Sequence, residues 1–345
     1  CSDCHNPHSA SLLTGDDPND VCSQCHLPER FATPEHSRHS LEDAACVDCH
    51  MTSRVYMGVD ARRDHSFRIP RPDLTSSTGS PNACNTCHDD QDAGWASARI
   101  SEWTGGKLPE PHFATVLHNA RNGFANDELA AMLQDSAVPG IARGTALTLF
   151  SSPLGVAEIN AVRTSLSDGD VQVRMGALQA LRQAPPELQL RLGTASLSDP
   201  ARSVRIEAAA LLAPLRPYLP ATATAAFAAA AEDFRRAQLA ISSRPEAHAS
   251  LGDFEAGLGN ADEARGHYQH ALLMEPNAPV VRVNFADALR RFGDETLAET
   301  VLREGILLNA SNAPLRHSLG LLLARSNRAE EGIVELRQAA DLQPG

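Results

Sequence analysis

The chain has 345 residues, enough for two or three domains, and a formal net charge of −13 at neutral pH. Acidic residues outnumber arginines in the first hundred positions, so a nucleic-acid surface is not expected. No segment is long and apolar enough to span a membrane. Binding to nucleic acid and insertion as a transmembrane helix are therefore both disfavoured.

All eight cysteines fall in one motif, Cys-x-x-Cys-His, which occurs four times within residues 1–88. Two cysteines at this spacing can form thioethers to the vinyl groups of one haem, and the following histidine can bind the iron from the proximal side. The predicted haem anchors are Cys1, Cys4, Cys22, Cys25, Cys46, Cys49, Cys84 and Cys87, and the predicted proximal ligands are His5, His26, His50 and His88. The sequence thus predicts four covalently bound haem c groups.

Zinc sites and disulfides are the alternative interpretations of paired cysteines. Neither requires a histidine directly after the second cysteine of every pair. The chain has only 14 histidines, so four such positions are not expected by chance. Haem attachment is the favoured interpretation.

Residues 1–105 are predicted to form a loop-rich tetrahaem domain with short helices around the motifs. This stretch has little hydrophobic periodicity, and four haems would supply the apolar bulk that it lacks. Each iron leaves one axial position, which a second histidine can close. The candidate distal ligands are His8, His65, His36, His39 and His118; one of His36 and His39 could instead bond a propionate, with His118 competing for the fourth iron, and His8 is too close to His5 to serve the same haem.

Five arginines gather around the third motif in a region that is otherwise acidic. They are Arg54, Arg62, Arg63, Arg68 and Arg71. They either neutralise haem propionates or form a solvated basic face. The sequence leaves both interpretations open.

A linker is predicted over residues 106–125, followed by helical repeats over residues 126–220. In these repeats Ala142-Arg143, Val173-Arg174 and Val204-Arg205 recur every 31 residues. Small and larger apolar residues follow each Arg at helical spacing. This pattern resembles HEAT repeats, in which helices pack through such positions.

A second period, of 34 residues, is predicted over residues 221–345. It aligns Leu251-Gly252 with Phe285-Ala286 and Leu319-Gly320. Two small positions with an aromatic residue or leucine between them resemble tetratricopeptide repeats. The predicted fold is therefore mainly α, a haem domain followed by an all-α solenoid.

The stretch from Cys46 to Trp95 resembles a family of bacterial multihaem c-type cytochromes with C-terminal tetratricopeptide repeats. Its markers are Asp64-His65-Ser66-Phe67-Arg68-Ile69-Pro70 and Gly79-Ser80-Pro81-Asn82-Ala83-Cys84. The resemblance implies electron transfer, export to the periplasm or cell exterior, and further haem motifs ahead of Cys1. We accordingly expect the signal peptide to lie outside this chain.

We expect an electron carrier rather than an enzyme, with mostly bis-histidine irons and a repeat arm that docks a redox partner protein. One alternative is part of a multihaem reductase with an open iron, which could lie upstream of this chain. Another is a repeat scaffold in which the haems are only structural. An iron that binds carbon monoxide would favour the reductase.

Overall fold

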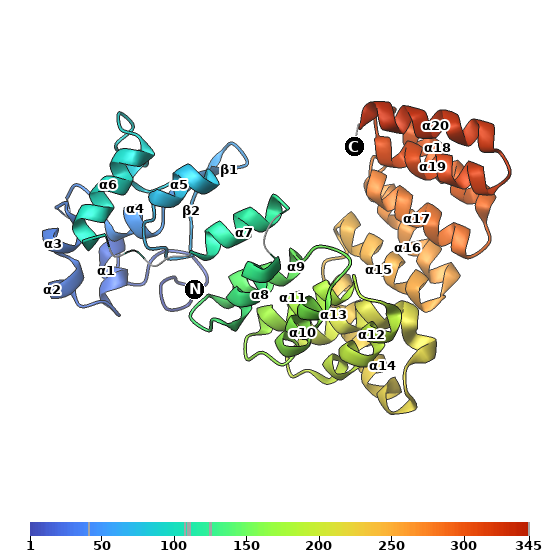
Figure 1. The fold of residues 1–345 in the computed structure, drawn as a ribbon, viewed down its shortest axis with the longest axis horizontal. Coiled ribbons are helices and arrows are strands. Elements are labelled where there is room, and N and C mark those ends of the chain that lie inside the picture. Colours follow the sequence, from blue (N-terminus) through green and yellow to red (C-terminus); the bar gives the residue numbers. More distant parts are fainter. Residues whose placement is uncertain (41, 107, 109–111, 124–125, 344–345) are drawn as a thin grey trace. The chain divides into compact units, whose positions relative to one another are not determined.

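The computed structural model describes residues 1–345 except 41, 107, 109–111, 124–125 and 344–345. The chain divides into two compact units, Cys1–Asn119 and Ala120–Gly345. The fold is mainly α, with a loop-rich first unit and a helical solenoid in the second, as predicted (Figure 1). Among the described residues, no helix has the length and apolar character that crossing a membrane requires.

The first unit consists of short helices joined by long loops. Its elements are α1 Pro18–Ser23, α2 Pro28–Phe31, α3 Pro34–Ser37, α4 Cys46–His50, β1 Ser53–Tyr56, β2 Asp60–Arg63, α5 Asp73–Thr78, a 3-10 turn Cys84–Thr86, α6 Ala93–Thr104 and α7 Phe113–Arg121, which extends past the unit boundary. Its described buried hydrophobic residues are Val47, Leu74, Ala96 and Val116. So small an apolar core fits the expectation that bound haem supplies part of the packing.

A β-hairpin that the sequence analysis did not predict follows the third motif. Strands β1 and β2 pair antiparallel, with Ser53 opposite Arg63 and Tyr56 opposite Asp60. Met57 and Gly58 in the turn both have positive φ, the conformation that tight hairpin turns require. The hairpin returns the chain to the third motif, where residues 63–68 contact the histidines described below.

The second unit begins with paired helices that follow the 31-residue period. Its first helices are α8 Asn126–Gln134, α9 Gly140–Thr148, α10 Val156–Ser165, α11 Val171–Leu181, α12 Pro186–Gly193 and α13 Arg202–Leu212. Helices α9, α11 and α13 start 31 residues apart, and α11 packs against both α9 and α13. The period read from the sequence is therefore the spacing of stacked helix pairs.

The recurring arginines link successive repeats. Arg143 binds Asp168 at 2.5 Å, and Arg174 binds Asp199 at 2.8 Å. Arg205 binds Asp233 at 2.7 Å. Each arginine thus reaches an aspartate about one repeat ahead, and we call these three pairs the Arg–Asp ladder.

A turn-rich joint separates the two repeat types. It contains 3-10 helices over Ala213–Tyr218 and Ala221–Ala223. Helix α14, Thr224–Leu239, follows and packs against the first helix of the second repeat series. Its Phe234 ring stacks on Phe254 of the next helix at 4.2 Å between centroids.

Three helix pairs follow the 34-residue period and stack in sequence (Figure 1). They are α15 Pro245–Leu258 with α16 Ala261–Met274, α17 Pro279–Arg291 with α18 Glu295–Leu308, and α19 Ala313–Arg325 with α20 Ala329–Leu342. Proline at the start of α15, α17 and α19 suits the first helical turn, where its missing N–H costs no hydrogen bond. Small residues have the predicted packing role, because a Cβ on Gly252 would lie 2.9 Å from the ring of Tyr268.

The predicted linker, residues 106–125, includes positions 107, 109–111 and 124–125, which lie outside the described residues. Its described part contains α7, whose Val116 is buried. The contact division at residues 119 and 120 also falls within this segment.

Candidate haem-binding site

Each cysteine motif forms one helical turn. His5 N–H donates to Cys1 O at 2.8 Å, and the same bond recurs from His26 to Cys22 and from His88 to Cys84. Helix α4 is the third motif itself. Residues three apart on a helical turn share a face, so the two thiols of each motif can reach one ligand. All eight cysteines are free thiols.

Motifs that follow one another in the sequence also lie next to one another in space. Burial raises the pKa of the Cys22 thiol, and the neighbouring Cys46 and Cys4 thiols raise it further. Burial likewise raises the pKa of Cys49, with Cys84 and Cys87 close by. The second motif therefore lies near the first and third, and the third lies near the fourth.

The first histidine pair joins His5 to His65, with ring centroids 6.2 Å apart and planes at 41°. His5 Nδ1 lies 2.8 Å from Ala10 O, and His65 Nδ1 lies 2.9 Å from Arg63 O. A carbonyl can only accept, so both Nδ1 atoms carry the proton. Each ring therefore keeps Nε2 as the atom with a lone pair.

The second pair joins His36 to His50, with centroids 6.1 Å apart and planes at 15°. His50 Nδ1 donates to Arg68 O at 2.8 Å, while Arg68 N–H donates back to His50 O at 3.0 Å. Burial and the nearby His50 lower the pKa of His36. A neutral ring is the form that binds metals.

The third pair joins His39 to His88, with centroids 6.0 Å apart and planes at 45°. His39 Nδ1 donates to Ser37 O at 2.9 Å, and Trp95 lies 4.8 Å from the His88 ring. Arg38, between His36 and His39, has a left-handed φ of 60°. Because of this turn at Arg38, the nearby His36 and His39 belong to different ring pairs.

These ring spacings fit a shared iron. A metal–imidazole bond is about 2 Å long and the ring centre lies about 1 Å further out, so two rings on opposite sides of one metal have centroids about 6 Å apart. Three free thiol pairs stand beside the three ring pairs. The residues present therefore fit covalently attached haem with two histidine ligands.

The remaining predicted ligands are arranged differently. The His26 ring contacts Phe31 at 5.2 Å, and no second histidine ring contacts it among the described residues. His8 is exposed on the loop after the first motif, and His118 lies on α7. The structure therefore pairs His65, His36 and His39 with the predicted proximal ligands His5, His50 and His88, and it leaves His8 exposed on its loop.

Four of the five clustered arginines form ion pairs within the first unit. Arg62 binds Asp60, Arg63 binds Asp48, Arg68 binds Asp64 and Arg71 binds Asp73. Arg71 is the most buried of them, with 8% of its side chain exposed. The cluster thus helps to fix the loops around the third motif.

Sequence reasoning did not identify the groups that orient the histidines. The orienting acceptors are backbone carbonyls of residues 10, 37, 63 and 68, which carry no side-chain signal. Phe31 was also missed, although it contacts two histidine rings. The spacing from His26 to Phe31 and from Phe31 to His36, five residues each, is a signal that could have drawn attention to it.

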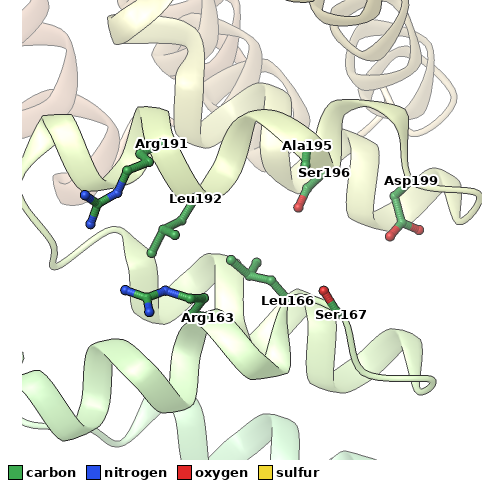
Figure 2. A pocket seen from close by; sticks show the side chains of 8 residues that line it. All are labelled: Arg163, Leu166, Ser167, Arg191, Leu192, Ala195, Ser196 and Asp199. Carbon is green, nitrogen blue, oxygen red and sulfur yellow. The ribbon is translucent and has the colours of Figure 1, made fainter.

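The second unit offers different chemistry. A shallow cleft of about 240 Å³ lies between α10 and α12, with Arg163 and Arg191 at one end, Leu166 and Leu192 between, and Asp199 at the other (Figure 2).

A histidine cluster lies between α15 and α16, where the ring centroids of His248 and His270 are 4.1 Å apart. In the described part of the chain, no group of three or more His, Cys, Asp or Glu side chains is arranged to hold a metal ion.

Known proteins are similar to parts of the chain. The family model described as "Doubled CXXCH motif" matches residues 1–31. No curated protein matches. Two solved structures are similar at 14% identity: a mutant of MamA, with a TM-score of 0.29, covering 46% of this chain and 97% of its own, and "MamA MSR-1 C2", with a TM-score of 0.30, covering 63% and 97%. The motif match indicates covalent haem c binding at the N-terminus.

Proposed function

We propose that the protein is a multihaem electron-transfer protein, with four haem c groups in the first unit and a helical-repeat arm that docks a redox partner. The observation that carries the proposal is the set of three histidine ring pairs, each about 6 Å apart and beside a cysteine motif. In these pairs the proximal ligands are His5, His50 and His88, and the distal ligands are His65, His36 and His39. His26 is the proximal ligand of the remaining iron, for which His8 and His118 are the predicted distal ligands.

Two histidines on one iron leave no position for a substrate. Bound haem supplies a one-electron redox couple. The paired histidines would hold each haem iron; four of them, His5, His39, His50 and His65, are oriented through Nδ1, and the fold brings successive motifs together. Such a site would pass electrons along the order of the motifs without making or breaking bonds in a substrate.

The repeat arm supports the docking part of the proposal. Stacked helix pairs present an extended surface, and such surfaces commonly bind other proteins. Within the part of the chain that the structure describes, the two arginines of the cleft form no ion pair, so an acidic partner surface would complement them. We also place the protein in the periplasm or outside the cell, since haem attachment to this motif takes place outside the cytoplasm.

Redox titration of the haem-loaded chain tests the function. We expect four electrons per chain in reversible steps, with low-spin spectra in both oxidation states for the three paired irons. Irreversible oxidation, or high-spin spectra at the paired irons, would contradict electron relay. Steady turnover of a substrate would favour the reductase alternative.

A kinetic comparison tests the arm. A variant with Arg163→Glu and Arg191→Glu, which reverses the charge at one end of the cleft, should exchange electrons with a small-molecule mediator as fast as the unsubstituted chain does, because the first unit is unchanged. It should be slower with the redox proteins of the host's extracytoplasmic fraction. Equal rates of the variant and the unsubstituted chain with both acceptors would contradict docking at this cleft.

A further inference from the structure

The second and third motifs are joined by more contacts than their thiols alone provide. Helix α1 packs on α4, and Cys46 N–H donates to Asn19 Oδ1 at 2.9 Å. The Cys22 thiol lies beside the Cys46 thiol. The anchors of two haems therefore meet at one point, which we call the α1–α4 junction.

Phe31 lies between the ring of His26, in the second motif, and the ring of His36, which pairs with His50 of the third motif. Its ring is 5.2 Å from His26 at 81°, and 5.3 Å from His36 at 87°. Both are edge-to-face contacts, the favoured geometry for aromatic rings at this distance. His36 in turn stacks against His50, so Phe31 connects the ligand of the second iron to the distal ligand of the third.

The local structure fixes Phe31 in this place. It ends α2, which begins at Pro28 and packs against α3, the helix that carries His36. The Arg30 guanidinium lies 5.2 Å from the Phe31 ring centroid. The Phe31 side chain is partly buried. Of the two histidines that its ring contacts, His26 precedes it in the sequence and His36 follows it.

We propose that Phe31 is a positioning residue that sets the imidazole planes of His26 and His36 and thereby couples the second and third haems. This inference rests on the proposed function. An imidazole held at a fixed rotation about its metal bond fixes the splitting of the iron d orbitals, and outer-shell contacts of this kind tune haem potentials. Of the three ring pairs, His36–His50 has the most nearly parallel planes, and its edge-on neighbour Phe31 is partly buried and contacts a second histidine, whereas Phe67, the edge-on neighbour of His65, is exposed.

The chain offers a matched control for Phe31. Phe67 is also edge-on to a distal histidine, with its ring 6.5 Å from His65 at 84°. It contacts the ligand of the first pair only and is 61% exposed. Phe31→Leu and Phe67→Leu therefore each remove a phenyl ring that is edge-on to a distal histidine, but at different haems.

The test is electron paramagnetic resonance of the oxidised, haem-loaded chain, together with spectroelectrochemical midpoint potentials. For Phe31→Leu we expect loss of the rhombic signal that near-parallel imidazole planes give, and shifts in two midpoint potentials. Phe31→Tyr keeps the ring and should restore both. Phe67→Leu should alter one signal of the first pair and leave the rhombic signal in place.

An unchanged rhombic signal and four unchanged potentials in Phe31→Leu, at full haem content, would overturn the inference. If Phe31→Leu loses haem, the variants Phe31→Tyr and Phe31→Trp test the inference instead. A rhombic signal that is kept with the tyrosine ring and altered with the larger tryptophan ring supports positioning, and a rhombic signal that is the same in both variants contradicts it. If only this inference fails, the irons of the three histidine pairs stay low-spin in every variant. Failure of the proposed function would instead show as missing low-spin signals in the unsubstituted chain.

Discussion

At the scale of single residues, hydrogen bonds to backbone carbonyls orient four of the predicted haem ligands. His5, His39, His50 and His65 each donate Nδ1–H to a backbone carbonyl. This fixes the tautomer and the direction of Nε2, as in most histidines that bind metals. His112 shows the opposite arrangement, because its Nδ1 accepts from Ala114 N–H at 3.1 Å. Its geometry therefore does not match that of the paired rings.

Replacing a distal ligand tests the pairing residue by residue. His65→Ala should convert one of the low-spin haems to high spin, because water or an open site would replace a strong-field ligand. The visible and paramagnetic resonance spectra of the loaded protein report this change. His317→Ala, on an exposed position of α19, is the control and should leave every haem low-spin. A low-spin spectrum in His65→Ala would contradict the His5–His65 assignment.

The motifs and the list of possible distal ligands could be read from the sequence, but the pairing could not. His5 and His65 are 60 positions apart, and the hairpin that brings them together was not predicted. Its strands are four residues long and exposed at every position, so they carry no alternation of apolar and polar residues. Without the hairpin, the sequence does not show which distal histidine pairs with which motif.

At the scale of helices, the Arg–Asp ladder explains the recurring Val-Arg pattern of the first repeats. Both side chains of the Arg174–Asp199 pair are largely buried, with 11% and 9% exposed. Arg174 also donates to Asp168 O at 2.8 Å, so one side chain links two inter-helix loops. The period of the arginines was visible in the sequence. Their partners were not, because an aspartate one repeat ahead resembles any other loop aspartate.

Removal of the arginine from the middle pair should destabilise the solenoid. Arg174→Ala leaves Asp199 buried without its partner, which costs about 3 kcal/mol or more in the free energy of unfolding. Thermal unfolding followed by circular dichroism measures the loss. Arg191→Ala, which removes an exposed arginine of α12, is the control and should change the unfolding free energy by less than about 0.5 kcal/mol. Equal effects of the two substitutions would contradict the ladder's role.

The histidine cluster between α15 and α16 should make the second unit sensitive to acid. Burial lowers the pKa of His248, and the nearby His270 lowers it further, while a backbone hydrogen bond with Ser242 partly opposes this. Burial also lowers the pKa of His267, with His248 and His270 adding to the effect and Glu255 and Glu263 partly opposing it. The folded pKa values then lie below the unfolded value of about 6.5. Between the two, the unfolded chain binds more protons, so stability falls as the pH falls through that window.

Unfolding midpoints at about pH 7.5 and about pH 5.5 measure this sensitivity. His248→Gln should reduce the difference between the two midpoints, since it removes the most buried member of the cluster. His317→Gln should leave the difference unchanged. A pH difference that persists in full in His248→Gln would show that other groups cause it.

At the scale of the whole chain, the two units depend on different sources of stability. In the second unit, helices α15 to α19 share a hydrophobic core that includes Tyr268, Leu289, Leu302 and Leu319, each 1% exposed or less. The first unit has four described buried hydrophobic residues over Cys1–Asn119. We therefore expect the repeats to fold on side-chain packing and the first unit to depend on bound haem.

Replacing all eight cysteines with serine separates these contributions. We expect the variant to keep the helical circular dichroism signal and cooperative unfolding of the repeats, because no cysteine lies beyond residue 87. The first unit should become sensitive to limited proteolysis. Protection of residues 1–105 in this variant would contradict the view that haem holds the first unit together.

The repeat architecture was the most predictable part of the molecule. Periods of 31 and 34 residues gave the helix pairs correctly, because each repeat uses the same small and large apolar positions. The first unit was predictable only in its motifs and its loop-rich character. Its short helices are held by contacts between distant residues, such as Asn19 with Cys46, that no local pattern encodes.

The visible absorption spectrum of the reduced, haem-loaded chain, recorded with and without carbon monoxide, tests the central claim most directly. Carbon monoxide binds a ferrous haem with an open axial position and leaves bis-histidine haems unchanged. We expect four c-type haems per chain, with at least three unaffected because His65, His36 and His39 would close their irons. A carbon monoxide shift at one haem would favour the reductase alternative, and a shift at two or more would contradict the pairing and with it the electron-relay function.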